Sequence, residues 1–181
     1  GEILEPMGLY GNAMPIKSVG VKADLRVYEH PVLIDGEASF EQLVGAAQKV
    51  LGQVPDVNRA LWNLSGTSVE TMLPKAAVMT RARLDLLREA DFHVMQGLER
   101  HGLYDSIWQC PTAMVPLCIN GKGEELIILR PVLSERAMSA RPASLPPELI
   151  AELRETIMNL PGVTGLALDL TSKPPGTIEW E

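Results

Sequence analysis

Lysine, glutamate and two prolines near the C-terminus form the part of the sequence best suited to hold a ligand. Lys173 precedes Pro174-Pro175, and a residue before proline is driven toward an extended conformation. The prolines stiffen the chain and Gly176 lets it turn, so one ammonium group would project from a rigid loop. Such a group can meet a phosphate as a point charge, and Glu179 could accept sugar hydroxyl groups. The same residues also fit a proline-stiffened hairpin with a solvated lysine, and both interpretations stay open.

Other candidate reactive groups indicate structure rather than chemistry. Residues 65–68, Ser-Gly-Thr-Ser, contain one glycine and no lysine, so we interpret them as a connector and not as a phosphate-binding loop. The two cysteines, Cys110 and Cys118, flank a predicted strand and are interpreted as reduced core residues. The histidines are too dispersed for a compact site, and we predict that they bind no metal: His30, His93 and His101.

Composition bounds the class of protein. The chain has 181 residues, of which 46% are hydrophobic, enough for one ordinary domain or two small ones. Its net charge is −7 and its basic residues are scattered, which argues against binding to DNA or RNA. No apolar run approaches the roughly 20 residues of a membrane span, and the first residues lack the pattern of a signal peptide. We therefore expect a cytoplasmic protein with no nucleic-acid or membrane partner.

A repeat with a period of about 100 residues divides the sequence. Four motif pairs occur in the same order in both halves: Gly8–Tyr10 with Gly102–Tyr104, Ala13–Ile16 with Ala113–Leu117, Pro31–Leu33 with Pro131–Leu133, and Val54–Ser65 with Leu160–Thr171. The repeat predicts two related modules, at residues 1–72 and 73–181.

Hydrophobic periodicity predicts an α+β fold in which each module is a mostly antiparallel sheet with helices packed on it. Each module reads as two strands, a helix and a third strand, and the longest helix, Lys75–His101, lies between the modules. In the first module we expect strands Ala13–Val21, Arg26–Ile34 and Val57–Leu64, with a helix from the cap Ser39 to about Leu51. In the second we expect strands Met114–Asn120, Glu125–Leu133 and Val163–Leu170, with a helix over Glu148–Asn159.

The last eleven residues, Thr171–Glu181, resemble the terminal signature of GMP synthase, which usually reads as a variant of Ser-Lys-Pro-Pro-Ala-Thr-Ile-Glu-Trp-Glu. Leu84–Asp91 and Gly102–Gln109 are similar to that family's helix and to the segment that leaves it. Pro15–Val21, followed by Arg26, resembles its hairpin. The resemblance covers nearly the whole chain and is strongest in its second half. A tandem pair of modules resembles the longer form of the family, as in the human enzyme.

This resemblance implies an α-β-β-α-β-β fold for the module and a part in the ATP- and glutamine-dependent amination of XMP to GMP. In that family the region forms the homodimer and supplies part of the XMP site. The expected contacts with the phosphate or ribose are Arg26, Gln109, Lys173, Ile178 and Glu179.

No catalytic residue and no cofactor is expected on this chain. Nothing in the sequence resembles the family's Ser-Gly-Gly-Val-Asp-Ser pyrophosphatase loop or its Cys-His-Glu amidotransferase triad. ATP and Mg²⁺ are therefore expected in an ATP pyrophosphatase domain, and glutamine hydrolysis in an amidotransferase domain. Both domains are expected partners, and the chain by itself is expected to be inactive.

One departure from the family pattern bears on the site. The family's Asn-Arg strand has its arginine as Arg59 in the first module, whereas Gly165 takes that place in the second. If this arginine supports the nucleotide or its loop, the site would be weakened. The alternative hypothesis is therefore a stand-alone, non-catalytic binding or assembly module derived from the same family.

Overall fold

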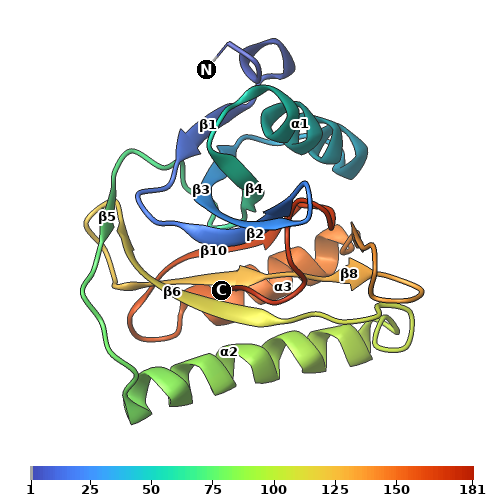
Figure 1. Cartoon of the computed structure of the whole chain (residues 1–181). Coiled ribbons are helices and arrows are strands. Elements are labelled where there is room, and N and C mark those ends of the chain that lie inside the picture. The colour runs from blue at the N-terminus through green and yellow to red at the C-terminus, as the bar shows by residue number, and fades with distance from the viewer. Residues whose placement is uncertain (1) are drawn as a thin grey trace.

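A computed structural model describes residues 2–181, which form one curled eight-stranded sheet, three α-helices and a small two-stranded sheet (Figure 1). A short 3₁₀ helix over Glu5–Met7 precedes the first strand. The elements of the first half are β1 (Tyr10–Ala13), β2 (Ser18–Lys22), β3 (Leu25–Asp35), α1 (Phe40–Gln53) and β4 (Val57–Asn63). Those of the second are β5 (Met72–Pro74), α2 (Arg81–Arg100), β6 (Thr112–Ile119), β7 (Glu125–Leu129), β8 (Val132–Leu133), β9 (Arg141–Pro142), α3 (Pro147–Met158) and β10 (Val163–Asp169).

The α+β class and the mostly antiparallel sheet are confirmed. The strand order is β1-β3-β4-β10-β7-β6-β5, with β2 paired to β3. Only the β3–β4 and β7–β10 pairs of this sheet are parallel among the described residues, and each is joined through a helix, α1 or α3. The two halves share a single sheet instead of forming separate ones, because β4 and β10 pair antiparallel at its centre.

The same irregularity recurs in both halves. The parallel register shifts at Asn58 of β4, between the pairs His30–Val57 and Pro31–Arg59, and at Thr164 of β10. Arg59 and Gly165 follow these shifts at equivalent positions, as the sequence repeat requires. The module boundary after residue 72 stays a prediction, although it falls inside β5, which pairs with β6 of the second half.

Local sequence accounts for the helix ends. Ser39 and Gln42 form a capping box at the start of α1, and the side chains predicted to face the core are buried: Leu43, Ala46, Ala47 and Val50. The helix predicted from Lys75 begins instead at Arg81, because the Thr80 hydroxyl accepts a hydrogen bond from the Arg83 amide at 3.2 Å and caps it there.

Prolines interrupt two predicted strands. The strand expected over Ala13–Val21 is split into β1 and β2, which pair with the end and the start of β3. Pro15 lies at the break, where it offers no amide donor to a ladder. The strand expected over Glu125–Leu133 likewise breaks before Pro131, so that β8 leaves the main sheet and pairs with β9.

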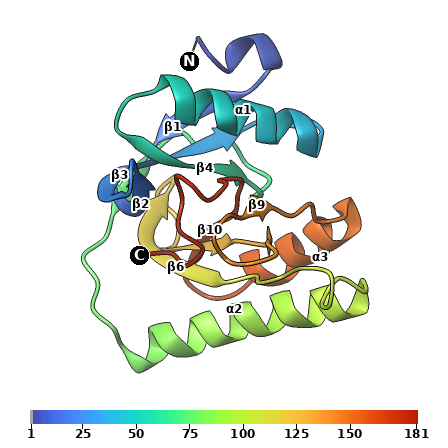
Figure 2. The same ribbon diagram turned by 45° about the vertical axis from the view of Figure 1, so that its right-hand side comes forward.

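The helices cover one face of the sheet and bury a core that runs through both halves. In Figures 1 and 2, α1 lies over the first half, and α2 and α3 lie side by side over the second. Leu43 of α1, Val94 of α2 and Leu153 of α3 belong to one apolar cluster. A second cluster, which includes Leu61 and Ile128, lies on the opposite face. The central strands are thus buried on both sides and form a rigid base for the segments attached to their ends.

Candidate functional site

The C-terminal segment, residues 171–181, lies between the two halves of the chain (Figures 1 and 2). On the first half, the Val21 amide donates to the Pro175 carbonyl at 2.7 Å, and the Val19 amide donates to the Glu181 carbonyl at 3.0 Å. On the second half, Lys173 and Ala140 exchange both backbone hydrogen bonds, at 2.8 and 3.2 Å. The segment therefore joins the halves and does not extend from a sheet edge as a free loop.

Lys173 holds its ammonium group against the second half. Its Nζ donates a hydrogen bond to the carbonyl oxygen of Ala137 at 2.7 Å, and the side chain is half-buried. A primary ammonium carries three donors, so this contact leaves two of them for a further partner. The arrangement differs from a lysine that is merely solvated at the tip of a hairpin.

Gln109 and Glu179 lie on the wall of one pocket, although they are far apart in the sequence. This pocket has a volume of about 440 Å³, and its lining includes Trp108, Cys110 and Asp91. Burial raises the pKa of the Cys110 thiol to about 12, and the nearby Asp91 carboxylate acts in the same direction. The pocket therefore offers one amide and two carboxylates, the exposed Glu179 and the half-buried Asp91, beside a thiol that stays protonated at neutral pH.

Ile178 anchors the pocket wall from behind. Its side chain is buried in a small cluster with Val132 and Ala140, so only its backbone is left for a ligand. Residues 177–180 form no regular element.

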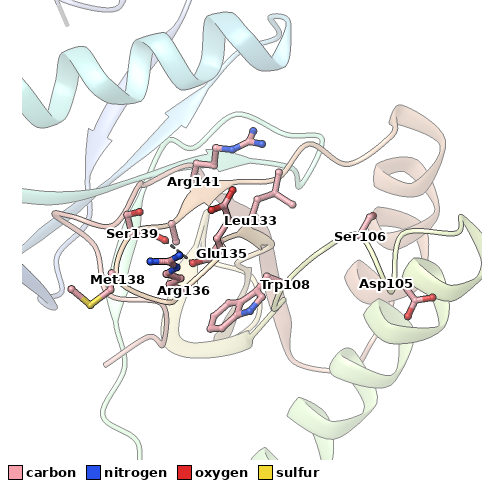
Figure 3. A pocket seen from close by; sticks show the side chains of 11 residues that line it. Asp105, Ser106, Trp108, Leu133, Glu135, Arg136, Met138, Ser139 and Arg141 are labelled. Carbon is pink, nitrogen blue, oxygen red and sulfur yellow. Dashed lines mark hydrogen bonds between the residues drawn. The ribbon is translucent and has the colours of Figure 1, made fainter.

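A larger, open pocket adjoins the first one and shares Trp108 with it. Its volume is about 860 Å³, and Figure 3 shows the Trp108 ring and the side chains of Arg136 and Met138 around it. Glu135 and Arg141 are also among its lining residues, so charges of both signs border this space.

Arg26 lies apart from both pockets. It is exposed on β3, and its Nη1 is 3.4 Å from the Glu181 carboxylate at the end of the chain. The structure thus brings Gln109 and Glu179 together and places Lys173 and Ile178 on the same segment as Glu179. Arg26 meets that segment at its far end. The role of all five residues in binding stays a prediction.

A buried charge cluster beneath the segment escaped the sequence reasoning. Arg59 of β4, Arg130 after β7 and Asp169 of β10 have fully buried side chains. Asp169 Oδ2 accepts hydrogen bonds from Arg59 Nη1 at 2.9 Å and from Trp180 Nε1 at 2.8 Å, and it lies 3.1 Å from Arg130 Nη1. The sequence did carry one signal for this cluster, since its charged residues lie inside or next to apolar strands. A buried charge requires a partner, so these residues could have been expected to pair.

The ionisation of this cluster follows from its geometry. Burial raises the pKa of the Asp169 carboxyl, but the charges of Arg130 and Arg59, with hydrogen bonds from Thr171, outweigh burial and lower it overall. Burial lowers the pKa of the Arg59 guanidinium, and the Asp169 carboxylate opposes that effect. Arginine stays charged at neutral pH, so the cluster carries two positive charges and one negative charge.

Gly165 lies beside the connector that follows β4. Across the antiparallel pair β4–β10, the Thr171 hydroxyl accepts from the Ala60 amide, and the Ser65 hydroxyl accepts from the Leu166 amide, each at 3.0 Å. Each half therefore supports the segment that follows the other half. Of the two arginines beneath the C-terminal segment, Arg59 comes from the first half and Arg130 from the second, whereas Gly165 faces the connector at Ser65.

The described part of the chain has neither a candidate metal site nor a candidate membrane-spanning helix. Within residues 2–181 no group of three or more His, Cys, Asp or Glu side chains could hold a metal ion. No helix in this part is long and apolar enough to cross a membrane.

Fold and site together define an α+β module whose C-terminal segment, clamped between two related halves, forms the wall of a pocket. Residues 96–180 match the family described as the GMP synthase C terminal domain, and the chain belongs to that family. The match includes Gln109, the Arg130–Asp169 pair and all but the last residue of the C-terminal segment.

Three proteins of similar sequence are named GMP synthases. The chain is 35% identical over 185 residues to the "probable" glutamine-hydrolysing GMP synthase of Leptospira interrogans, an alignment that covers 96% of this chain and 29% of that protein. It is 47% identical over 111 residues to the GMP synthase of Leifsonia xyli, covering 57% of this chain and 22% of that protein. The corresponding values for the GMP synthase of Thermobifida fusca are 43%, 57% and 21%. The chain thus spans less than a third of these relatives' length.

Proposed function

We propose that this chain supplies part of the XMP site of a GMP synthase, the ligase that aminates XMP to GMP with ATP and glutamine. The observation that carries the proposal is the pocket shared by Gln109 and Glu179, next to the segment that holds Lys173. ATP, Mg²⁺ and glutamine would be handled by an ATP pyrophosphatase domain and an amidotransferase domain. Alone, the chain would bind the nucleotide weakly and catalyse nothing.

The chemistry of each residue suits a nucleotide. A volume of about 440 Å³ lies within the usual range of small-molecule sites. The Glu179 carboxylate would accept hydrogen bonds from ribose hydroxyl groups, and the Gln109 amide can both donate and accept. Lys173 would contact the phosphate with the donors that Ala137 leaves free. Ile178 would contribute its backbone.

The resemblance implies that Arg26 is the second phosphate cation, although it lies on neither pocket in this structure. Its guanidinium can hold a phosphate with two parallel hydrogen bonds, which a lysine cannot do. In this structure its partner is Glu181, across an exposed contact of 3.4 Å. Exposed pairs of this kind contribute at most about 1 kcal/mol, so a phosphate could replace Glu181 at low cost.

The alternative of a stand-alone module that lost the site has less support than the sequence indicated. It relied on Gly165, and Gly165 contacts the connector at Ser65 and not the C-terminal segment. We also propose a homodimer. Leu25 and Tyr28 of the β2–β3 hairpin are exposed apolar side chains that a dimer interface would cover. Light scattering would measure the mass of the protein in solution. A strictly monomeric mass would refute the dimer alone.

Calorimetry with XMP on the enzyme assembly tests the binding proposal. Lys173→Ala removes a charge-assisted contact worth about 1.5–3 kcal/mol, so we expect XMP affinity to fall about 10- to 100-fold. Lys122→Ala is the matched control. Lys122 is exposed in the turn before β7, whereas Arg130, which contacts the C-terminal segment, follows the other end of that strand. Unchanged XMP affinity in Lys173→Ala would refute the assigned role.

A further inference from the structure

Arg59 makes more contacts with the C-terminal segment than its place in the first half of the chain would suggest. We propose that Arg59 is a positioning residue of the nucleotide pocket: it fixes the backbone of Thr177 and Glu179, and so sets where the Glu179 side chain lies relative to Gln109. This inference rests on the function proposed above, because it concerns the same pocket.

The guanidinium of Arg59 bonds the segment at three atoms. Nη2 donates to the Thr177 hydroxyl at 2.6 Å and to the Glu179 carbonyl at 3.1 Å, and Nη1 donates to the Thr177 carbonyl at 3.2 Å. The Trp180 ring covers the guanidinium, with its centroid 4.8 Å from the central carbon. A lysine could not reproduce these contacts, since they need the planar fork of several donors.

Arg130 completes the clamp from the second half. Its Nε donates to the same Thr177 carbonyl at 2.9 Å, and its Nη1 donates to the Thr171 carbonyl at 2.9 Å. Asp169, between the two guanidinium groups, holds both arginines in place. One arginine from each half of the chain therefore grips the same peptide unit of the segment.

The clamp acts from the side that the ligand does not occupy. The Glu179 backbone is held by Arg59, while its side chain is exposed and lines the pocket with Gln109. Ile178, between the two clamped residues, is buried. Arg59 itself is fully buried and lines neither pocket, so a change there would reach the ligand only through Glu179 and its neighbours.

The second half of the repeat has no counterpart of Arg59. At the equivalent position in the second half, a Cβ on Gly165 would lie 3.1 Å from Ile119 Cδ1, from Leu126 Cδ1 and from Ser65 Oγ. That position has no room for an arginine. The clamp is therefore present beneath the C-terminal segment and absent beneath the connector that follows β4.

Two variants in the enzyme assembly test the proposal. Arg59→Lys keeps the charge beside Asp169 but loses the fork. Thr177→Val removes the hydroxyl that Arg59 Nη2 contacts, together with the hydrogen bond that this hydroxyl donates to the Glu179 carbonyl at 2.6 Å. We expect each to weaken XMP binding about tenfold or more, because small displacements of a binding group are costly. The KM for XMP should rise while the KM for ATP stays unchanged. Amide exchange at residues 177–179 should accelerate.

Two controls separate positioning from general destabilisation and from failure of the binding proposal. Val50→Ala destabilises α1, a helix that lines a pocket with Ser172 but not with residues 177–179, and should leave XMP affinity unchanged. If it weakened binding as much as Thr177→Val does, the positioning role would be overturned. Unchanged affinity in Thr177→Val, with Lys173→Ala still weakened, would overturn the role of Arg59 and leave the XMP site standing. If XMP affinity were also unchanged in Lys173→Ala, the role of Arg59 and the proposed XMP site would both be refuted. Should Arg59→Lys not fold, Thr177→Val decides.

Discussion

Replacing Asp169 by asparagine removes the negative charge that lies between two buried guanidinium groups. Oδ2 bonds Arg59 Nη1 and Trp180 Nε1 and lies 3.1 Å from Arg130 Nη1, and Oδ1 accepts from the Thr171 amide at 2.9 Å. Asparagine has nearly the same volume, so the substitution opens no cavity. It removes the charge and turns a donor group toward other donors.

The expected loss of stability is large. Removing one partner of a buried ion pair costs about 3–5 kcal/mol, because the remaining charge is buried without compensation. Here two guanidinium groups would lose their partner at once. We therefore expect the free energy of unfolding to fall by about 3–5 kcal/mol, out of the roughly 5–15 kcal/mol of an ordinary domain.

Urea unfolding at pH 7 measures this loss, with Asp35→Asn as the matched control. Asp35 is also buried, but its donors are neutral: Asn63 Nδ2 at 2.6 Å, the Val69 amide at 3.0 Å and Asn12 Nδ2 at 3.3 Å. Its replacement should cost only the hydrogen bonds to a charged acceptor, about 1–3 kcal/mol. A loss in Asp169→Asn no larger than that in Asp35→Asn would refute the importance of the charge cluster.

Acid supplies a second check on the same residue. The pKa of Asp169 is lowered in the folded chain, so its contribution is present above the ordinary aspartate pKa, about 4, and is lost as pH falls toward the folded value. The difference in unfolding free energy between wild type and Asp169→Asn should therefore narrow below about pH 4. A difference that widened in acid would contradict the assigned sign.

Two further predictions concern packing and the thiol. Gly97→Ala in α2 places a Cβ 2.6 Å from Leu149 Cδ1 of α3 and should cost about 1–3 kcal/mol in urea unfolding. Gly45→Ala in α1 adds a Cβ that would meet no atom within 4 Å beyond its neighbours in the same helix, and it should stabilise the chain by about 0.5–1 kcal/mol. Equal effects of the two substitutions would contradict the close contact between α2 and α3. Cys110, whose pKa is raised to about 12, should resist iodoacetamide at pH 8 until urea unfolds the chain, as peptide mapping would show. Rapid labelling of the native chain would contradict this.

Local signals in the sequence predicted the helices well. Ser39 with Gln42 marks the start of α1, and the apolar spacing from Leu43 to Val50 identifies its buried face. Such features depend on residues three or four positions apart, so no knowledge of the fold is required. The start of α2 was placed too early because Lys75 still bonds β6, through its amide and the Pro116 carbonyl, and residues 76–80 form no regular element before Thr80 caps the helix.

Long-range partners account for what could not be predicted. Arg59 and Asp169 are separated by 110 positions in the sequence, and only the antiparallel pairing of β4 with β10 brings them together. The sequence repeat indicated which positions are equivalent, and the recurring register shift agrees with it. The repeat did not indicate that each half supports the segment that follows the other half. For this reason the sequence could not show that Gly165 lies beside the connector at Ser65 and not beside the C-terminal segment.

The candidate site shows the same division. Gln109 and Glu179 were named from resemblance, but their placement on one pocket depends on how the C-terminal segment folds back between the halves. Arg26 lies near Glu181 and not on that pocket, because the β2–β3 hairpin contacts the end of the segment. The sequence showed which side chains could bind a nucleotide. Which of them lie together depends on how the sheet brings the two halves of the chain into contact.

Hydrogen exchange of the enzyme assembly, with and without XMP, tests the central claim most directly. If the C-terminal segment and residues 107–110, the stretch that contains Gln109, form the nucleotide pocket, XMP should slow amide exchange at residues 107–110 and 171–179. The connector at residues 65–68, which takes the equivalent place after β4, supplies an internal control and should not respond. Unchanged exchange at residues 171–179, or slowing confined to the connector, would contradict the account.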